Sequence, residues 1–381
     1  MPLTAPTLME VTRWRRKLHA RPDISGEEHE TAREVVDFLS PTRPDRVITG
    51  LGGTGVAVIY QGTEPGPTVA IRAELDALPI FETGTPPWRS TVAGKGHMCG
   101  HDGHMAILAA VGHALGNRRP RRGRAVLLFQ PAEETGAGAA AMIGDGQFAD
   151  ARPDVTLSLH NMPGLPFGHV WLKEGTANCA SQGLRIVLTG RTAHASLPHT
   201  GLSPAPAIAD LVPALTALGG GSLETGDLTL ATVTHVRIGE PTFGIAPGEG
   251  EIRVTLRTQT DAAMAAVRAA AEDCARAAAQ RDGLTVLFEE HDVFRAAVNH
   301  PQAVALLRNA LDAEGVPHSE GEAMRASEDF GRFADISASA MFFLGAGETH
   351  PAPHSPDYDF PDDLIPIGAR IFLRAIHDLL D

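Results

Sequence analysis

The chain of 381 residues is poor in cysteine, in aromatic residues and in long apolar runs. Its three cysteines, Cys99, Cys179 and Cys274, are too few and too scattered to form a disulfide framework. Because no run of about 18 apolar residues is present, we expect no transmembrane helix and no membrane partner. The first residues also lack the apolar run of a signal peptide, so we expect a cytoplasmic protein.

Positive charge is also scarce. The chain has 32 Lys and Arg residues against 46 Asp and Glu residues, a net charge of −14. A nucleic-acid-binding protein needs basic surface to replace phosphate counterions, so we expect no nucleic-acid partner. The one basic run, RRPRRGR at residues 118–124, separates a helix-like from a strand-like segment, and we interpret it as a solvated loop.

Hydrophobic residues make up 43% of the chain, which is typical of folded proteins, and the length indicates two domains. A helical pattern runs from Thr7 to about Leu39. Over residues 1–180 and 294–381, strand-like and helix-like segments alternate, which predicts an α/β domain with a mixed, mostly parallel sheet. Residues 181–293 follow the order strand–helix–strand–strand–helix–strand, which predicts an inserted ferredoxin-like α+β domain.

Potential chemistry is concentrated in the stretch CGHDGH. Cys99 and His101 are two residues apart, so in extended backbone both side chains face the same side and one ion. Asp102 is well placed as the N-cap of a helix beginning near His104. Alone, the stretch is compatible with a metal site, with a cysteine nucleophile beside a base, or with a polar strand–helix junction.

Polar side chains also follow two apolar, strand-like runs. Glu133 and Glu134 come after AVLLFQP, and His160 ends LSLH. Adjacent buried carboxylates repel each other, and a metal resolves this if one glutamate ligates and the other takes a proton from water. His160 alone fits a core histidine equally well, and His350 and His354 lie in a proline-rich loop. One Cys, one Glu and three His suit Zn, Mn, Co or Ni.

Several motifs occur in order: RRKLHARPDISGEE, RAELDALP, CGHDGH, QPAEE, LHNMPGLPFG, TAHASLPH, ASEDF and HSPDYDF. Together they resemble the M20 metallopeptidase family. The match is to its amidohydrolase branch, which includes hippurate hydrolases, N-acyl-amino-acid amidohydrolases and plant auxin-conjugate hydrolases. The resemblance covers nearly the whole chain.

The resemblance implies a site with two divalent metal ions and a general acid/base, Glu133. It implies that Asp76 orients a metal-binding histidine, and that His194 in the inserted domain holds the substrate carbonyl oxygen. It also implies that this domain acts as a lid and dimerises, giving a homodimer or a higher homo-oligomer. The metal ligands carried over are Cys99, His101, Glu134, His160 and His354.

The implied reaction is hydrolysis of the amide bond of N-acyl amino acids by a metal-activated water. A dipeptidase or carboxypeptidase on the same fold is the close alternative, and a non-catalytic binding protein is the more distant one. One departure concerns the substrate: Gly244 stands where the family has an asparagine that helps bind the substrate carboxylate. Arg257 stands at a family arginine and has the geometry to pair with a carboxylate in a bidentate manner.

Overall fold

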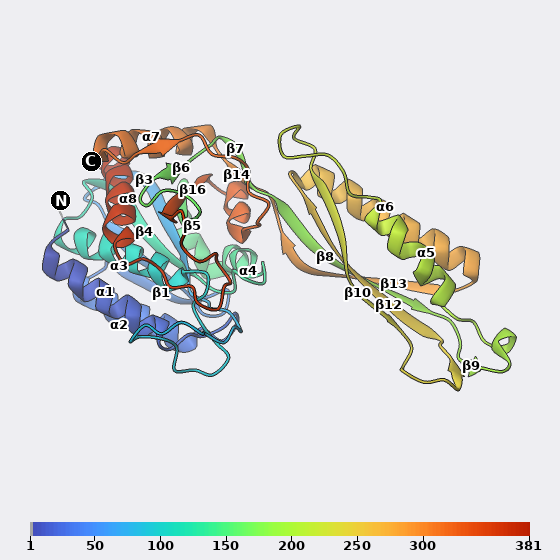
Figure 1. Cartoon of the computed structure of the whole chain (residues 1–381). Helices are drawn as coiled ribbons and strands as arrows, with labels where there is room; N and C mark the ends of the chain where they lie inside the picture. Colours follow the sequence, from blue (N-terminus) through green and yellow to red (C-terminus); the bar gives the residue numbers. More distant parts are fainter. Residues whose placement is uncertain (1–2) are drawn as a thin grey trace. The chain divides into compact units, whose positions relative to one another are not determined.

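A computed structural model describes residues 3–381 and divides into two compact units (Figure 1). The second unit comprises Asn178–Ala297 and Ala323–Glu328, and the rest of the chain forms the first unit. The predicted insertion, 181–293, lies within the second unit. Residues 323–328, which we expected in the first domain, group with the second unit instead. Within residues 3–381, no helix is long and apolar enough to cross a bilayer.

Eight strands of the first unit form one sheet. They are β1 (Arg46–Leu51), β2 (Gly55–Gln61), β3 (Glu64–Glu74), β4 (Arg122–Gln130), β5 (Val155–Pro163), β6 (Val170–Trp171), β15 (His318–Ser319) and β16 (Ala338–Gly347). Their order across the sheet is β1-β2-β4-β3-β5-β16-β6-β15. The central strands β4, β3, β5 and β16 run parallel to their neighbours in this group, whereas β1 and β2 are antiparallel. The predicted mixed α/β sheet is confirmed.

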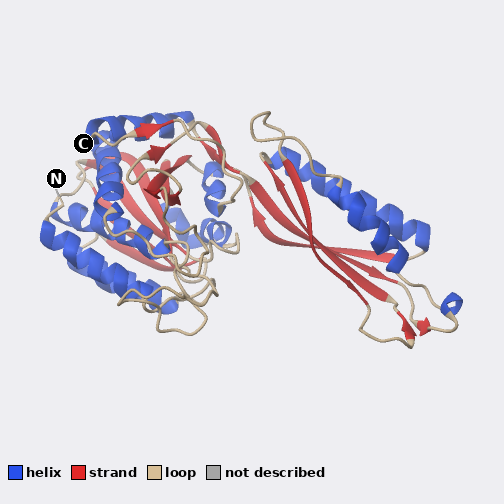
Figure 2. Cartoon of the chain, viewed as in Figure 1, coloured by secondary structure: helices blue, strands red, loops and turns tan. Residues whose placement is uncertain are grey.

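Helices flank this sheet (Figures 1 and 2). They are α1 (Ala5–His19), α2 (His29–Leu39), α3 (His101–Asn117), α4 (Gly138–Gly144), α7 (Pro301–Glu314) and α8 (Leu364–Leu380), with 3-10 turns at Ser40–Thr42, Gly146–Ala151 and Asp329–Asp335. Helix α3 is buried on nearly all sides because it packs against α1, α8 and the sheet. The helical pattern we expected from Thr7 to Leu39 is two helices, since Pro22 and the left-handed Gly26 interrupt it.

The second unit has a four-stranded antiparallel sheet in the order β10-β12-β8-β13. Its elements are β8 (Ala180–Thr189), β9 (Ala193–His194), α5 (Ala205–Thr216), β10 (Thr229–Ile238), β11 (Ile245–Ala246), β12 (Glu249–Thr258), α6 (Asp261–Asp282) and β13 (Thr285–Phe294), with a 3-10 turn at Pro198–Thr200. The chain order and strand order are those of a ferredoxin-like βαββαβ unit. Two short strands, β7 (Gly175–Asn178) and β14 (Ala297–Asn299), pair separately.

The parallel strands position the polar residues of the first unit. Because β3, β4, β5 and β16 run in the same direction, their carboxyl ends meet at one edge of the sheet. The segments that follow these strands begin at Leu75, Pro131, Gly164 and Glu348. Side chains that are far apart in the sequence therefore converge at this edge.

Asp102 has a different role from the one predicted. Helix α3 begins at His101 with Gly100 as its N-cap, so Asp102 lies in the first turn. Its buried carboxylate accepts hydrogen bonds from Arg15 (3.0 Å) and His19 (2.9 Å) at the end of α1. Burial alone would lower the pKa of His19, but Asp102 and Glu82 raise that pKa to about 9. The cluster ties α1 to the start of α3, next to His101.

This cluster makes the stability of the first unit depend on pH. The folded-state pKa of His19 lies above its unfolded value of 6.5, so its stabilising contribution is complete below pH 6.5 and disappears as pH rises through 9. We expect His19→Gln to lose roughly 2 kcal/mol of unfolding free energy at pH 6 and much less above pH 9. Urea unfolding followed by tryptophan fluorescence measures this, because Trp14, Trp88 and Trp171 all belong to the first unit. An equal loss at both pH values would contradict the expectation.

Candidate metal centre

The structure brings the sequence-selected ligand candidates together at the carboxyl edge of the sheet. Cys99 and His101 stand at the start of α3, Glu133 and Glu134 follow β4, and His160 lies near the end of β5. The loop after β16 supplies the remaining histidine. Among these candidates, three sets of ligand atoms lie within 4.8 Å of one another: Cys99, His101 and His160; Cys99, Glu134 and His354; and His101, Glu133 and Glu134. A fourth such set joins His101 to the neighbouring Glu74 and His104.

Cys99 Sγ lies 3.4 Å from His160 Nε2, within reach of a hydrogen bond to sulfur, whereas other atoms of these groups face one another at longer or poorer distances. His101 Nε2 lies 3.8 Å from Glu134 Oε1, and His354 Nε2 lies 3.4 Å from Glu134 Oε2. Over residues 3–381, both His101 Nε2 and Glu134 Oε1 are buried atoms without a hydrogen-bond partner. Unpaired buried donors and acceptors are costly. A thiolate, carboxylates and imidazoles directed at a common point therefore fit a divalent cation.

Backbone carbonyls fix the opposite sides of two imidazole rings. His101 Nδ1 lies 2.8 Å from the Asp76 carbonyl oxygen and 3.5 Å from Asp76 Oδ1. His160 Nδ1 lies 2.7 Å from the Asn161 carbonyl oxygen. An Nδ1–H that donates to oxygen leaves Nε2 as a lone-pair acceptor for a metal. The closer Asp76 atom is thus its carbonyl oxygen rather than its carboxylate.

Electrostatics at this edge act differently on the candidate ligands. Burial opposes a charge on His101, but Cys99 and Asp76 raise the pKa of His101 well above its usual value. Burial raises the pKa of the Cys99 thiol well above its usual value, and the nearby Glu134 and Glu133 add to this rise. Burial also lowers the pKa of His160 to about 3, with His104 contributing. A divalent cation would favour the thiolate of Cys99 and requires the neutral imidazole, which burial already favours at His160.

Two residues of the site have unusual backbone conformations. Within the described chain, four non-glycine residues have positive φ, among them Ala132 (48°), directly before Glu133, and His354 (67°). The His354 amide donates to the Met98 carbonyl at 2.7 Å, which holds the loop. Such conformations cost about 1–3 kcal/mol each and persist mainly where the surrounding structure enforces them.

The two candidates of the second unit have local partners. His194 is exposed on β9, its Nδ1 lies 2.7 Å from Ser196 Oγ, and the following amide, Ala195 N–H, donates to Gly244 O at 3.0 Å. Arg257 Nη1 donates to the Arg325 carbonyl at 2.5 Å and to Ser327 Oγ at 2.6 Å. Arg257 therefore links β12 to residues 323–328, and with the backbone bonds from Cys179 to Met324 and Ala326 this places the segment in the second unit.

The sequence reasoning overlooked Glu74. It is the last residue of β3, is completely buried, and places Oε2 2.6 Å from His104 Nδ1. The signal was present in RAELD, where Arg72 and Glu74 alternate along one strand and so share one face, and Asp76 follows just after the strand ends. Two charged residues on one face of an apolar strand indicate a buried polar network.

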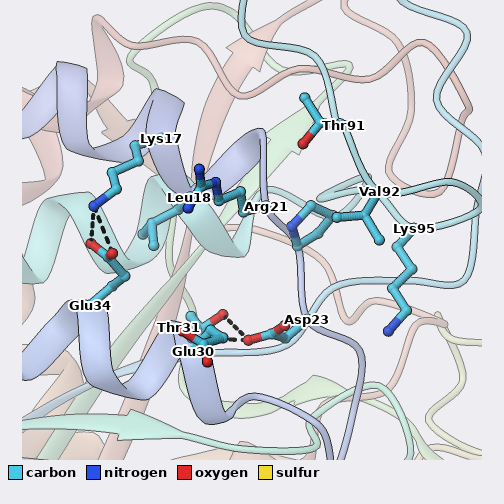
Figure 3. A pocket seen from close by; sticks show the side chains of 11 residues that line it. Lys17, Leu18, Arg21, Asp23, Glu30, Thr31, Glu34, Thr91, Val92 and Lys95 are labelled. Carbon is cyan, nitrogen blue, oxygen red and sulfur yellow. Dashed lines mark hydrogen bonds and ion pairs between the residues drawn. The ribbon is translucent and has the colours of Figure 1, made fainter.

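A cavity of about 370 Å³ lies elsewhere in the first unit, between α1, α2 and the segment Thr91–Lys95 (Figure 3). Lys17 Nζ in its wall pairs with Glu34 at 2.6 Å, and Asp23 accepts from Thr31 at 2.9 Å. None of the candidate ligands lines this cavity. It is therefore separate from the metal centre.

Comparison with known proteins identifies the family. The model of peptidase family M20/M25/M40 matches residues 70–378. The chain belongs to the M20 peptidase family. The predicted family, and with it the hydrolase class, is confirmed.

Related M20 proteins align over nearly the whole chain. An N-acetyl-L-cysteine deacetylase of Bacillus subtilis is 30% identical over 96% of this chain and 87% of the relative. The IAA-amino acid hydrolase ILR1-like 2 of Arabidopsis thaliana is 30% identical over 94% of this chain and 82% of the relative. Among solved structures, an aminohydrolase from methicillin-resistant Staphylococcus aureus superposes with a TM-score of 0.87 at 27% identity, covering 99% of this chain and all of the other.

Gly100 gives a direct test of how tightly the M20 site is packed. Its φ is +93°, and a Cβ there would lie 2.4 Å from Asn161 Oδ1 and 2.9 Å from the Tyr358 hydroxyl. Gly26 is a matched control, since its φ is +82° but a Cβ would meet nothing within 4 Å. We expect Gly26→Ala to lose about 1 kcal/mol of unfolding free energy. Gly100→Ala should lose about 1–3 kcal/mol more than Gly26→Ala, because its new methyl group has no space.

Urea unfolding and zinc titration of the two glycine variants measure these effects. Gly100→Ala should also weaken zinc binding, because it displaces the residue next to His160, whereas Gly26→Ala should not. Equal losses of stability in the two variants would show that backbone conformation alone, and not the close packing, requires glycine at position 100.

Proposed function

We propose that this chain hydrolyses the amide bond of N-acyl amino acids at a site holding two divalent metal ions. The observation that carries the proposal is the convergence of the candidate ligand atoms around Glu133 and Glu134. The names of two M20 relatives, an N-acetyl-L-cysteine deacetylase and an IAA-amino acid hydrolase, support this substrate class. The proposed ligands are Cys99, His101, Glu134, His160 and His354.

Bound divalent cations supply Lewis acidity, which makes water more acidic and withdraws electrons from a substrate carbonyl. Glu133 is the proposed general acid/base. It is buried, shares a group of potential ligand atoms with His101 and Glu134, and its Oε1 accepts from the Asp329 amide at 3.4 Å. A carboxylate held there takes the proton from the attacking water and delivers it to the leaving amine.

Two residues of the second unit have proposed supporting roles. His194 is exposed and is proposed to stabilise the oxyanion that forms from the carbonyl oxygen. Arg257 is proposed to bind the substrate carboxylate through its other guanidinium nitrogens, because Nη1 already donates to the Arg325 carbonyl and to Ser327 Oγ.

Glu133→Gln tests the reaction. The amide keeps the shape of the side chain but cannot accept a proton, so we expect kcat to fall about 10²–10⁴-fold while metal content stays unchanged. Steady-state hydrolysis of N-acetyl and N-benzoyl amino acids gives kcat, and elemental analysis of dialysed protein gives the metal per chain. Activity equal to that of the parent would exclude Glu133 as the base. If the parent cleaves free-amino dipeptides but no N-acyl amino acid, the proposed substrate class is wrong.

Gly244 bears on the choice of substrate. It lacks the side-chain donor that the resemblance leads us to expect, and we propose that the parent tolerates substrates without an α-carboxylate. A Cβ built on Gly244 meets nothing within 4 Å, and its backbone φ is not in the left-handed region, so a side chain fits there.

Gly244→Asn should therefore restore selectivity for the free acid. We expect it to raise the kcat/KM ratio of N-acyl amino acids over their primary amides about tenfold, the value of one hydrogen bond to a charged group. Parallel measurement of both substrate series on both proteins gives the ratio. A parent that already prefers the free acids strongly would contradict the proposal.

A further inference from the structure

A buried polar network adjoins the metal centre without contributing any of its proposed ligands. Its members come from β3, α3, β4, β5 and the turn Asp329–Asp335, and each is no more than 1% exposed. They are Arg72, Glu74, His104, Gln130, Asn161 and Asp329. A network with this much buried charge is retained in a fold only where its hydrogen bonds compensate for lost hydration.

His104 connects this network to the neighbourhood of His160, because its two ring nitrogens contact two different residues. Its Nδ1 lies 2.6 Å from Glu74 Oε2 and its Nε2 lies 2.6 Å from Asn161 Oδ1, so both ring nitrogens are occupied. The His104 and His160 rings meet edge to face, with centroids 4.9 Å apart. Asn161 in turn provides the carbonyl that fixes His160 Nδ1 at 2.7 Å. His104 thus holds the residue that orients His160.

Arg72 extends the network towards Glu133. It forms ion pairs with Glu74 and, at 2.7 Å, with Asp329 Oδ1. Gln130 Nε2 donates to both Asp329 oxygens at 2.8 Å. The Asp329 amide then donates to Glu133 Oε1 at 3.4 Å. One continuous set of contacts therefore joins the orientation of His160 to the position of Glu133.

We propose that His104 is a positioning residue, which aligns His160 through Asn161 and Glu133 through Glu74, Arg72 and Asp329. The inference rests on the proposed function only in taking His160 as a ligand and Glu133 as the base. Partners of metal-binding histidines commonly contribute to affinity and activity in this manner.

Three substitutions of His104 separate its two contacts. The amide nitrogen of Asn lies near the position of Nδ1, and that of Gln near Nε2. His104→Asn should keep the contact with Glu74 and lose Asn161, whereas His104→Gln should keep Asn161. We expect His104→Ala and His104→Asn to weaken cobalt(II) binding and lower kcat, each about 10- to 100-fold, with KM changed far less. His104→Gln should keep most of the parent's cobalt(II) affinity and most of its kcat.

His97 offers the matched control. It is equally buried in the same segment, and within residues 3–381 neither ring nitrogen has a hydrogen-bond partner. His97→Asn should leave cobalt(II) affinity and kcat near the parent values. Titration of the metal-free proteins, followed by the visible absorption of bound cobalt(II), gives affinity and coordination without any substrate. Thermal unfolding of the same metal-free samples shows whether each variant is folded.

The outcomes are distinct. Parent-like cobalt(II) affinity in His104→Asn, or an equal loss in His97→Asn, would overturn the positioning role. If His104→Ala does not fold, the difference in cobalt(II) affinity between His104→Asn and His104→Gln still tests the positioning role. A parent that binds cobalt(II) but cleaves no N-acyl amino acid refutes the proposed function while the affinity measurements still test His104. A parent that binds no cobalt(II) refutes both.

Discussion

The candidate metal centre depends above all on Asp76, which joins four segments of the first unit at one point. Its carbonyl lies against His101 Nδ1, and its carboxylate accepts from Ser25 Oγ at 2.7 Å and from the Glu134 amide at 3.0 Å. Burial opposes the charged carboxylate, but His101 and these donors lower its pKa. Both donors bond to Oδ2, and Oδ1 has no hydrogen-bond partner within residues 3–381. Through its carbonyl and Oδ2, Asp76 holds the end of β3, the start of α3 and the turn after β4 together.

Much of this arrangement could be predicted from the sequence, because it follows from local patterns. Apolar runs that end in polar residues marked β4 and β5, and parallel neighbours place their carboxyl ends at one edge. Cys99, Glu133 and His160 were therefore predictable as neighbours, although each has a common structural explanation when considered alone. The order of elements in the second unit likewise fixed its ferredoxin-like topology, since six alternating segments admit few connections.

The rest could not be predicted, because it depends on contacts between distant residues. Asp102 has the residue type and position of an N-cap, and only the approach of Arg15 and His19 from α1 gives it another role. Helix capping by Gly100 instead reflects the lack of space beside Asn161, which no local pattern records. Residues 323–328 group with the second unit because Arg257 and the backbone of Asn178 and Cys179 all contact that segment. Spacing along one strand indicated a network around Glu74, but not that His104 would complete it.

The contacts also show which parts of the site the chain's own backbone holds. His101 and His160 each have one ring nitrogen held by a backbone carbonyl, and the backbone of His354 is held by Met98. The opposite atoms face the common point between the carboxylates, where His101 Nε2 has no partner within residues 3–381. The fold carries strain at Ala132 and His354, and within the described chain it leaves buried atoms such as His101 Nε2 and Glu134 Oε1 unpaired, which binding of a cation would compensate.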